Sequence, residues 1–183
     1  MPSREEADDA LMEALCGGSA RAFQRLYDRH SGGLFTFLAR LLSDRGQAEE
    51  LLQETFLRVY LQRARYRPRG TFRTWLYTIA RNLALDRLRR HGLGEAEPAP
   101  GSLEAIPDPD PGPLRRLEGR EALGRLEEAL AKLPPGQREV LLLARYAGLG
   151  HAEIAEVTGS SPGAVRVALH RALRALRQLL SRP

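Results

Sequence analysis

The sequence predicts an all-α fold in which two small helical domains are joined by a flexible linker, and three observations support this. Ala, Leu, Arg and Glu, which favour helices, are frequent, whereas Val, Ile and Thr are sparse. Apolar residues recur every three or four positions, as one face of a helix requires, and strict alternation of apolar and polar residues is absent. A single Pro-rich segment divides the chain into two parts.

The first domain, residues 5–91, is predicted to contain four helices. Apolar periodicity places them near residues 5–16, 19–42, 46–64 and 71–90. The tripeptide at residues 31–33, Ser-Gly-Gly, predicts a kink or break in the second helix. Cys16 is the only cysteine, which excludes an internal disulfide, and it lies among apolar helical positions, so we expect it to be buried.

Residues 92–113 form the predicted linker. This segment holds six of the 12 prolines and five acidic residues, with no Lys or Arg. Proline removes a backbone donor and the acids repel one another, so the segment neither keeps a helix nor collapses onto a core. Two interpretations stay open: a solvated spacer, or an acidic strip that repels nucleic acid or rests on a basic surface.

The second domain, residues 114–181, is predicted to contain four further helices. They lie near residues 114–131, 135–147, 151–157 and 161–180. Residues 132–135, Lys-Leu-Pro-Pro, force a boundary because a residue before proline avoids the α region. Gly159 suits a tight turn, Ser161 is a natural N-cap and Pro162 a natural first helical residue. The last two helices therefore predict a helix-turn-helix.

The last predicted helix divides into an apolar face and a basic face. The apolar positions, which we expect to be buried, are Val165, Leu169, Ala172, Leu176 and Leu180. The opposite stripe consists of Arg166, His170, Arg174 and Arg177, with Arg171 beside it. A helix that enters a DNA groove needs this division, since one face is held by a core while the other presents donors to phosphates and base edges. The alternative is a solvated basic face.

Composition and charge limit the function classes. The net charge is +5 and Lys132 is the only lysine among 28 basic residues, which favours arginine contacts to phosphates and guanines, although GC-rich coding or adaptation to heat gives the same abundance. No apolar run approaches the ~20 residues of a membrane span, and the polar N-terminus is not a secretory signal, so we expect a cytoplasmic protein. The four histidines are scattered and no nucleophile–base motif stands out, so we predict no catalytic residue, metal site or cofactor.

The second domain resembles region 4 of the sigma-70 family, in the form found in extracytoplasmic-function (ECF) sigma factors. The resemblance is carried by LPPGQREVLLLARYAGLGHAEIAEVTGSSPGAVRVALHRALRALRQLL, residues 133–180. It implies that this domain binds the −35 promoter element in the major groove. The implied contacts are Arg138, Ser160, Ser161, Arg166, Val167, His170, Arg171 and Arg174. Gly150 replaces a usual Ser or Thr helix cap, and Val167 and Ala168 replace a small polar and basic pair, which predicts altered or weakened contacts.

A stripe of polar residues and leucines lies beside the apolar face of the helix predicted near 46–64. It consists of Glu50, Gln53, Glu54, Leu57 and Leu61. Spacing alone supports a solvated face and a protein-docking strip equally. The stretch QAEELLQETFLRVY, residues 47–60, resembles region 2.2 of sigma factors, which implies docking on the clamp coiled coil of the RNA polymerase β′ subunit. The implied contacts are Glu50, Gln53, Glu54, Phe56, Leu57 and Tyr60.

Residues 63–90 combine nine arginines with one acidic residue, and four aromatic residues lie among them. Arginines follow a phosphate backbone, and an aromatic ring holds an unstacked base by roughly 1–3 kcal/mol. Not every ring is available for this, because Trp75 shares helical spacing with Ile79 and Leu83. We therefore expect Trp75 in the core rather than as a platform for a base.

The stretch GTFRTWLYTIARNLALDRLRR, residues 70–90, is similar to ECF regions 2.3 and 2.4. The resemblance implies capture of a flipped-out base of the −10 element, with Tyr66 as a wall of the pocket and Asn82 bonded to the base edge. An extruded base needs a stacking surface and a donor–acceptor pair, and the unstacking cost favours easily melted sequences. The implied −10 contacts are Tyr66, Arg67, Arg69, Arg73, Asn82, Asp86 and Arg87.

Together the resemblances cover about residues 19–90 and 114–181. They imply an ECF-type sigma factor that binds core RNA polymerase through the β′ clamp and β subunits, and directs promoter recognition, strand opening and transcription initiation without catalysis of its own. They also imply an anti-sigma protein that covers the docking surfaces. The alternative function is a stand-alone helix-turn-helix DNA-binding regulator, for which the stripe from Glu50 to Leu61 would be incidental.

Overall fold

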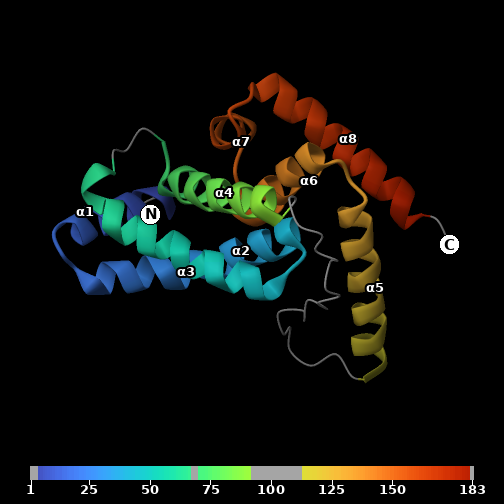
Figure 1. Ribbon diagram of the computed structural model, residues 1–183, viewed down its shortest axis with the longest axis horizontal. Helices are drawn as coiled ribbons and strands as arrows, with labels where there is room; N and C mark the ends of the chain where they lie inside the picture. The colour runs from blue at the N-terminus through green and yellow to red at the C-terminus, as the bar shows by residue number, and fades with distance from the viewer. Residues whose placement is uncertain (1–3, 67–69, 92–112, 182–183) are drawn as a thin grey trace.

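The described chain, residues 4–66, 70–91 and 113–181 of a computed structural model, is built from helices (Figure 1). The elements are α1 (Arg4–Cys16), α2 (Ala20–Leu42), α3 (Arg45–Gln62), a 3₁₀ turn η1 (Arg63–Arg65), α4 (Phe72–His91), α5 (Pro113–Ala131), α6 (Pro135–Leu142), a π-helical turn η2 (Leu143–Ala147), α7 (His151–Thr158) and α8 (Pro162–Leu180). The predicted all-α fold with two small helical domains is confirmed. The predicted linker, apart from Pro113, lies outside the described residues, and the three domain boundaries stay predictions.

Local sequence signals set most of the helix ends. Ser161 caps α8 by accepting a hydrogen bond from the backbone N–H of Ala164 (3.2 Å), with Pro162 as the first helical residue, as predicted. Gly159 ends α7 at φ 67°, a left-handed conformation in which a side chain would be strained. Asp44 caps α3 by accepting from the N–H of Gln47 at 2.9 Å.

Helix α2 continues through residues 31–33, so the chain does not break there, and the predicted kink stays a prediction. Gly33 is required by packing instead. A Cβ atom at this position would lie 3.1 Å from the carbonyl oxygen of Tyr146 and 3.3 Å from the hydroxyl of Tyr77. The glycine therefore allows the π-helical turn η2 to approach α2 closely.

The first lobe, α1 to α4, is a helical bundle with a fully buried interior. Leu26, Phe37, Leu51 and Leu76 are each at most 1% exposed and belong to the central apolar cluster. Cys16 lies at the surface, so its predicted burial is wrong; its Sγ donates to the carbonyl oxygen of Arg63 at 3.0 Å. The thiol thereby links the end of α1 to η1.

In the second lobe, α5 to α8, α8 packs on α6 and α7 through the predicted apolar face. Val165 and Ala172 are buried, and Leu169 and Leu176 pack against the core. Leu180 is 43% exposed, so its predicted burial is wrong. It is the last residue of α8, where the helix projects beyond the lobe that covers its earlier turns (Figure 1).

The two lobes pack directly on each other, which the sequence did not predict. Helix α4 packs on α2 and α3 of its own lobe and on α7 of the second lobe, and α2 contacts α6 and η2 directly (Figure 1). Buried residues of both lobes form one continuous apolar cluster. In the part of the chain that is described, each helix is too short or too polar to cross a bilayer.

Candidate functional site

The stripe predicted on α3 is exposed and partly apolar. Leu57 and Leu61 are 55% and 66% exposed, and Tyr60 is 43% exposed beside them. Glu50 and Gln53 are also exposed on this helix. Because the side chains that should favour burial face solvent together, the stripe has the composition of a docking surface rather than of a solvated face.

Phe56 does not belong to that surface, and its predicted role as a direct contact is wrong. It is 2% exposed, and its ring packs against Tyr27 at 4.7 Å and Phe23 at 6.1 Å between centroids. Phe56 belongs to the core-facing side of α3, and its packing holds in place the helix that carries the stripe.

Ion pairs fix the polar members of the stripe. Glu54 accepts from Arg58 one turn later at 2.7 Å, and Glu50 accepts from Arg87 of α4 at 2.9 Å. Arg87, predicted to contact the −10 element, is therefore engaged with α3 in this structure, and Asp86 pairs with Arg89. The side chains of all three ion pairs are partly exposed, so exchanging their partners costs little free energy.

Helix α4 presents three different sides. One side, which includes Leu76, Ala80 and Leu83, is buried in the first lobe. A second side, from Arg73 to Arg81, faces the second lobe. Asn82 is exposed on the remaining side. It follows Trp75 by seven residues, which is two helical turns and about 10 Å along the axis.

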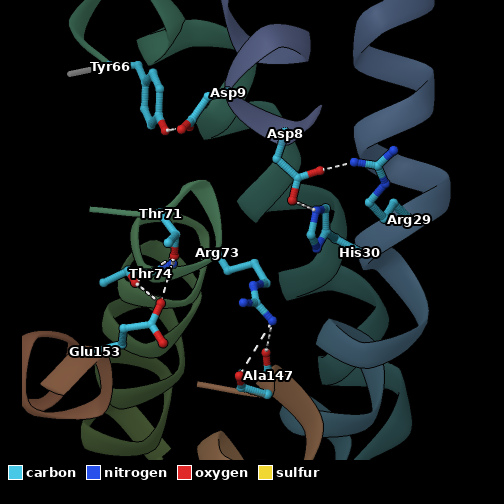
Figure 2. Close-up of polar contacts among 11 residues, drawn as sticks. Asp8, Asp9, Arg29, His30, Tyr66, Thr71, Arg73, Thr74, Ala147 and Glu153 are labelled. Carbon is cyan, nitrogen blue, oxygen red and sulfur yellow. Dashed lines mark hydrogen bonds and ion pairs between the residues drawn. The ribbon is translucent and has the colours of Figure 1, made fainter. Parts of the chain in front are cut away.

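Tyr66 lies at the start of that open side, in an aromatic cluster. Its ring centroid is 5.0 Å from that of Trp75 and 6.4 Å from that of Phe72. Trp75 packs against the core but is only half-buried, which confirms its predicted core contact in part. The Tyr66 hydroxyl donates to Asp9 of α1 at 2.6 Å (Figure 2). Burial and this hydrogen bond raise the pKa of Tyr66 above its usual value, so the phenol stays protonated.

The neighbouring residue, Asp8, ties α1 to α2 inside the same region (Figure 2). Its carboxylate, 1% exposed, pairs with Arg29 and lies 2.9 Å from Nε2 of His30. Burial alone would raise the pKa of Asp8, but the hydrogen bonds and charges of His30 and Arg29 outweigh it and hold the pKa below its usual value. The carboxylate is thus charged and fully partnered.

The side of α4 that faces the second lobe is held by two arginines. Arg81 Nε donates to Glu139 of α6 at 2.5 Å and its Nη2 reaches the second carboxylate oxygen at 3.3 Å. Nη1 of Arg73 donates to the carbonyl oxygens of Ala147 and Gly148, at 3.3 and 3.5 Å (Figure 2). Arg73, a predicted −10 contact, is therefore engaged within the chain in this conformation.

Glu153 of α7 joins the starts of two helices (Figure 2). Its Oε1 accepts from the hydroxyls of Thr71 at 3.0 Å and Thr74 at 3.3 Å, at the start of α4. Its Oε2 accepts from the N–H of Gly150, the N-cap residue of α7, at 2.8 Å. A carboxylate is favoured at both positions because helix N-termini carry partial positive charge. Glu153 thereby supplies the glutamate half of a capping box, whereas Gly150 has no side chain to supply the other half.

Arg138, a predicted −35 contact, is engaged within the chain in this conformation. It donates to the carbonyl oxygens of Arg40 and Leu41, the latter at 2.8 Å, and to Ser43 Oγ at 2.8 Å. Burial lowers the pKa of its guanidinium from the usual value. Arg138 thus fastens α6 to the end of α2.

The outward face of α8 carries the other predicted −35 residues. The side chains of Arg166, His170, Arg171 and Arg174 are exposed, and Val167 is 47% exposed among them. A groove of about 650 Å³ next to this face is lined partly by Ser160, Val167 and Arg171. The face has the donors and the accessible apolar side chain expected of a helix that enters a DNA groove. Arg67 and Arg69, predicted for the −10 element, lie outside the described residues.

Sequence reasoning missed the acidic residues that organise these surfaces. Asp8 has a recognisable signal, because it shares helical spacing with Met12 and Leu15, which are both buried, and a charge at a buried position needs a partner. Asp9, Glu139 and Glu153 have no such signal, since each could equally be a solvated surface acid. In the described ranges no cluster of three or more His, Cys, Asp or Glu side chains could hold a metal ion.

Comparison with known proteins gives consistent matches for both lobes. A family model of sigma-70 region 2 matches residues 26–93, and a model of sigma-70 region 4 matches residues 123–176. The RNA polymerase sigma factor CarQ of Myxococcus xanthus is 39% identical over 173 residues, which cover 92% of this chain and 95% of CarQ. The ECF RNA polymerase sigma factor SigE of Mycolicibacterium smegmatis is 34% identical over 182 residues, which cover 99% of this chain and 70% of SigE.

Solved structures match the whole arrangement. CnrH, in its complex with the cytosolic domain of CnrY, superposes with a TM-score of 0.72 at 29% identity, covering 95% of this chain and 97% of CnrH. The sigma factor RpoE of Bartonella quintana, in complex with the anti-sigma factor NepR, has a TM-score of 0.73 at 22% identity, covering 88% and 98% of the two chains. The second likeness concerns the fold alone.

Proposed function

This chain belongs to the sigma-70 family as an ECF RNA polymerase sigma factor, and from that premise we propose which surfaces carry out promoter recognition and transcription initiation. The first lobe docks on core polymerase and holds the opened −10 element, and the second lobe binds the −35 element. The chain contributes binding and no catalysis of its own. Its place of action is the cytoplasm, where the polymerase works. The stand-alone regulator is the less favoured alternative.

The observation that carries the docking proposal is the exposed strip on α3, with Leu57 and Leu61 more than half exposed. An apolar strip flanked by Glu50, Gln53 and Glu54 suits a partner surface that offers both apolar contact and hydrogen-bond donors. We assign it to the β′ clamp coiled coil of the polymerase.

The docking test is co-purification of the full chain with core polymerase. The Gln53→Ala/Glu54→Lys double variant should lose holoenzyme assembly while its helical circular dichroism and melting temperature stay close to those of the parent. A matched control is Glu13→Lys, which makes a similar charge change at an exposed position on α1. Retention of the double variant on the polymerase would contradict the assignment.

For the −10 element, we assign the open side of α4. Tyr66 supplies a ring face, Asn82 supplies an amide donor and acceptor, and Arg73 supplies a cation once it leaves the second lobe. Capture of one unstacked base in this way fits the aromatic cluster and the exposed amide at two turns' distance. Arg67, Arg69, Asp86 and Arg87 complete the proposed set.

For the −35 element, we assign the exposed face of α8. Arg166, His170, Arg171 and Arg174 contact phosphates and base edges, and Val167 contacts the methyl group of a thymine. Run-off transcription with core polymerase on genomic fragments tests both assignments at once. Start-site-specific RNA that requires this chain is the expected result, and its absence from every native template would refute the proposed function.

We also propose that an anti-sigma protein restrains this chain by covering the α3 strip. The support is chemical, because leucines exposed on a functional helix need a cover when the polymerase is absent. The structure of a similar protein, CnrH, is that of a complex with the cytosolic domain of CnrY. A partner of this kind should compete with core polymerase for the full chain and should lose affinity for the Leu57→Ala/Leu61→Ala variant.

A further inference from the structure

Two adjacent acids of α1 contact residues at the two ends of the aromatic cluster at the start of α4, and Figure 2 shows both contacts, of Asp9 with Tyr66 and of Asp8 with His30. Asp9 accepts the hydroxyl of Tyr66 at 2.6 Å, at one end. At the other end Asp8 fixes His30, whose ring centroid is 5.2 Å from that of Phe72. Between these ends, Trp75 lies 5.0 Å from Tyr66 and 6.2 Å from Phe72.

Helix α1 is itself a rigid support for this contact. Met12 and Leu15 are fully buried, and Asp8 is anchored to α2 through Arg29 and His30. Asp9 is therefore presented from a fixed backbone, and its bond fixes one orientation of the Tyr66 ring. A side chain is positioned well when a rigid element locks its rotamer in this way.

We propose that Asp9 is a positioning residue for base capture, which holds the ring of Tyr66 against Trp75 in one orientation for stacking with an unstacked base of the −10 element. The inference rests on the proposed role of Tyr66 in the −10 contact. It extends that role to a helix for which the sequence indicated no part in DNA binding.

The geometry also limits what Tyr66 contributes. Its hydroxyl is committed to Asp9, so the ring offers a stacking face rather than a donor to the base edge. Selection between bases must then come from other groups, and Asn82, about 10 Å further along the exposed side of α4, is the nearest assigned amide. Tyr66 thus determines how strongly the base stacks, and the fixed orientation of its ring determines how the base edge is presented to Asn82.

Electrostatics makes the proposal sharply testable. A carboxylate beside single-stranded DNA repels phosphates, so removal of a charge at Asp9 should by itself strengthen binding. Loss of positioning has the opposite effect, because an unrestrained Tyr66 ring must be ordered when the base binds. We expect the loss of positioning to weaken binding about fivefold, which is the cost of ordering roughly one side chain on binding.

The single tryptophan provides the signal, because Trp75 touches Tyr66. Quenching of Trp75 fluorescence in the full chain is titrated with the oligonucleotides dA12, dC12 and dT12. The variants are Asp9→Ala, Asp9→Asn, Tyr66→Phe, Tyr66→Ala and the Asp9→Ala/Tyr66→Phe double variant. Asp28→Ala, which removes an exposed acid of the same lobe, controls for net charge.

The expected pattern is specific to positioning. Tyr66→Phe weakens binding about fivefold, Asp9→Ala weakens it less because loss of the carboxylate charge offsets part of the effect, both reduce the difference between bases, and the double variant is no worse than Tyr66→Phe. Asp9→Asn, which keeps an acceptor for the hydroxyl, retains most of the affinity. Asp28→Ala binds as well as the parent or better.

Two failures can be told apart. If Tyr66→Ala leaves affinity and base preference unchanged, the proposed −10 role of Tyr66 is wrong and the inference falls with it. If Tyr66→Ala weakens binding while Asp9→Ala behaves like Asp28→Ala, base capture stands and the positioning role is overturned. Equal losses in Asp9→Asn and Asp9→Ala also overturn it, because the hydrogen bond would then not matter. Tyr66→Phe keeps the ring, so it remains informative even if Asp9→Ala melts early.

Discussion

The ion pair between Arg81 and Glu139 offers a direct way to measure how strongly the lobes hold each other. It is bidentate, with contacts of 2.5 and 3.3 Å, and the two side chains are only 18% and 11% exposed. A charge-assisted pair in such surroundings contributes about 2 kcal/mol. Because the two residues belong to different lobes, Glu139→Ala should act on the contact between lobes rather than on the folding of either one.

A loss of about 2 kcal/mol lowers the ratio of closed to open molecules roughly 30-fold. The remaining contacts of Glu153, Arg73 and Arg138 limit the opening, so we expect a shift in population rather than complete separation. Arg81→Ala should have the same effect, and a double-mutant cycle isolates the pair from the cost of leaving one charge unpaired.

The assay is energy transfer between dyes on the two lobes. Cys16, the only cysteine and exposed, takes one dye, and an exposed position on α8, Gln178→Cys, takes the other. Glu139→Ala should lower the transfer efficiency, and added salt should lower it further. Glu128→Ala, the same change at an exposed position on α5, serves as the control. A coupling energy near zero between Arg81 and Glu139 would refute the reasoning.

Three further outcomes follow from the structure. Asp8→Asn should lower the free energy of unfolding by about 2 kcal/mol at pH 7. Because the pKa of Asp8 is lowered in the folded protein, the contribution of the carboxylate to stability is complete above the ordinary pKa of 3.8 and is lost as the pH falls through the folded pKa. Urea denaturation should therefore show that the free energies of unfolding of the variant and the parent converge in acid. Ser161→Ala should cost about 0.5–2 kcal/mol through the lost cap of α8, and an unchanged melting temperature would count against that cap. Arg174→Ala should weaken −35 duplex binding alike on all sequences and reduce the slope of affinity against salt by about one, as measured by anisotropy over a range of KCl concentrations.

Local chemistry explains why most elements could be predicted. Ser161 and Pro162 define a helix start by their own side chains, and Gly159 defines a helix end by its positive φ. The apolar spacing of α3 likewise placed Leu51 and Val59 in the core. Such signals act within one or two turns, so a single sequence contains them in full.

The packing of the lobes depends on contacts that no local pattern records. Arg81 and Glu139 are 58 residues apart, and each looks like a solvated surface charge in its own helix. Gly33 has the composition of a helix breaker, yet it is needed because η2 approaches α2 there. The sequence could therefore indicate that two lobes exist, but not that a carboxylate or a glycine joins them.

The candidate surfaces show the same division. The exposed strip on α3 could be inferred because leucines stood on a side expected to face solvent, and the structure places Leu57 and Leu61 there. Phe56 was misassigned because a family motif combines residues that support a surface with residues that form it. Burial separates the two kinds, and burial depends on the partners each side chain meets in three dimensions.

The closed arrangement imposes an order on how the surfaces become available. The α3 strip and the ring of Tyr66 with its neighbouring Asn82 lie outside the contact between the lobes, whereas Arg73 and Arg138 are engaged in it. A ligand shifts such an equilibrium only by its differential affinity for the open form. In this closed form duplex DNA can reach the exposed face of α8 but not Arg73, which becomes available only when the contacts between the lobes are displaced, so the free chain should bind promoter duplex weakly and lose that binding steeply with salt. If the α3 strip is the polymerase-docking surface, as proposed, core polymerase meets no such barrier there, and docking should precede separation of the lobes.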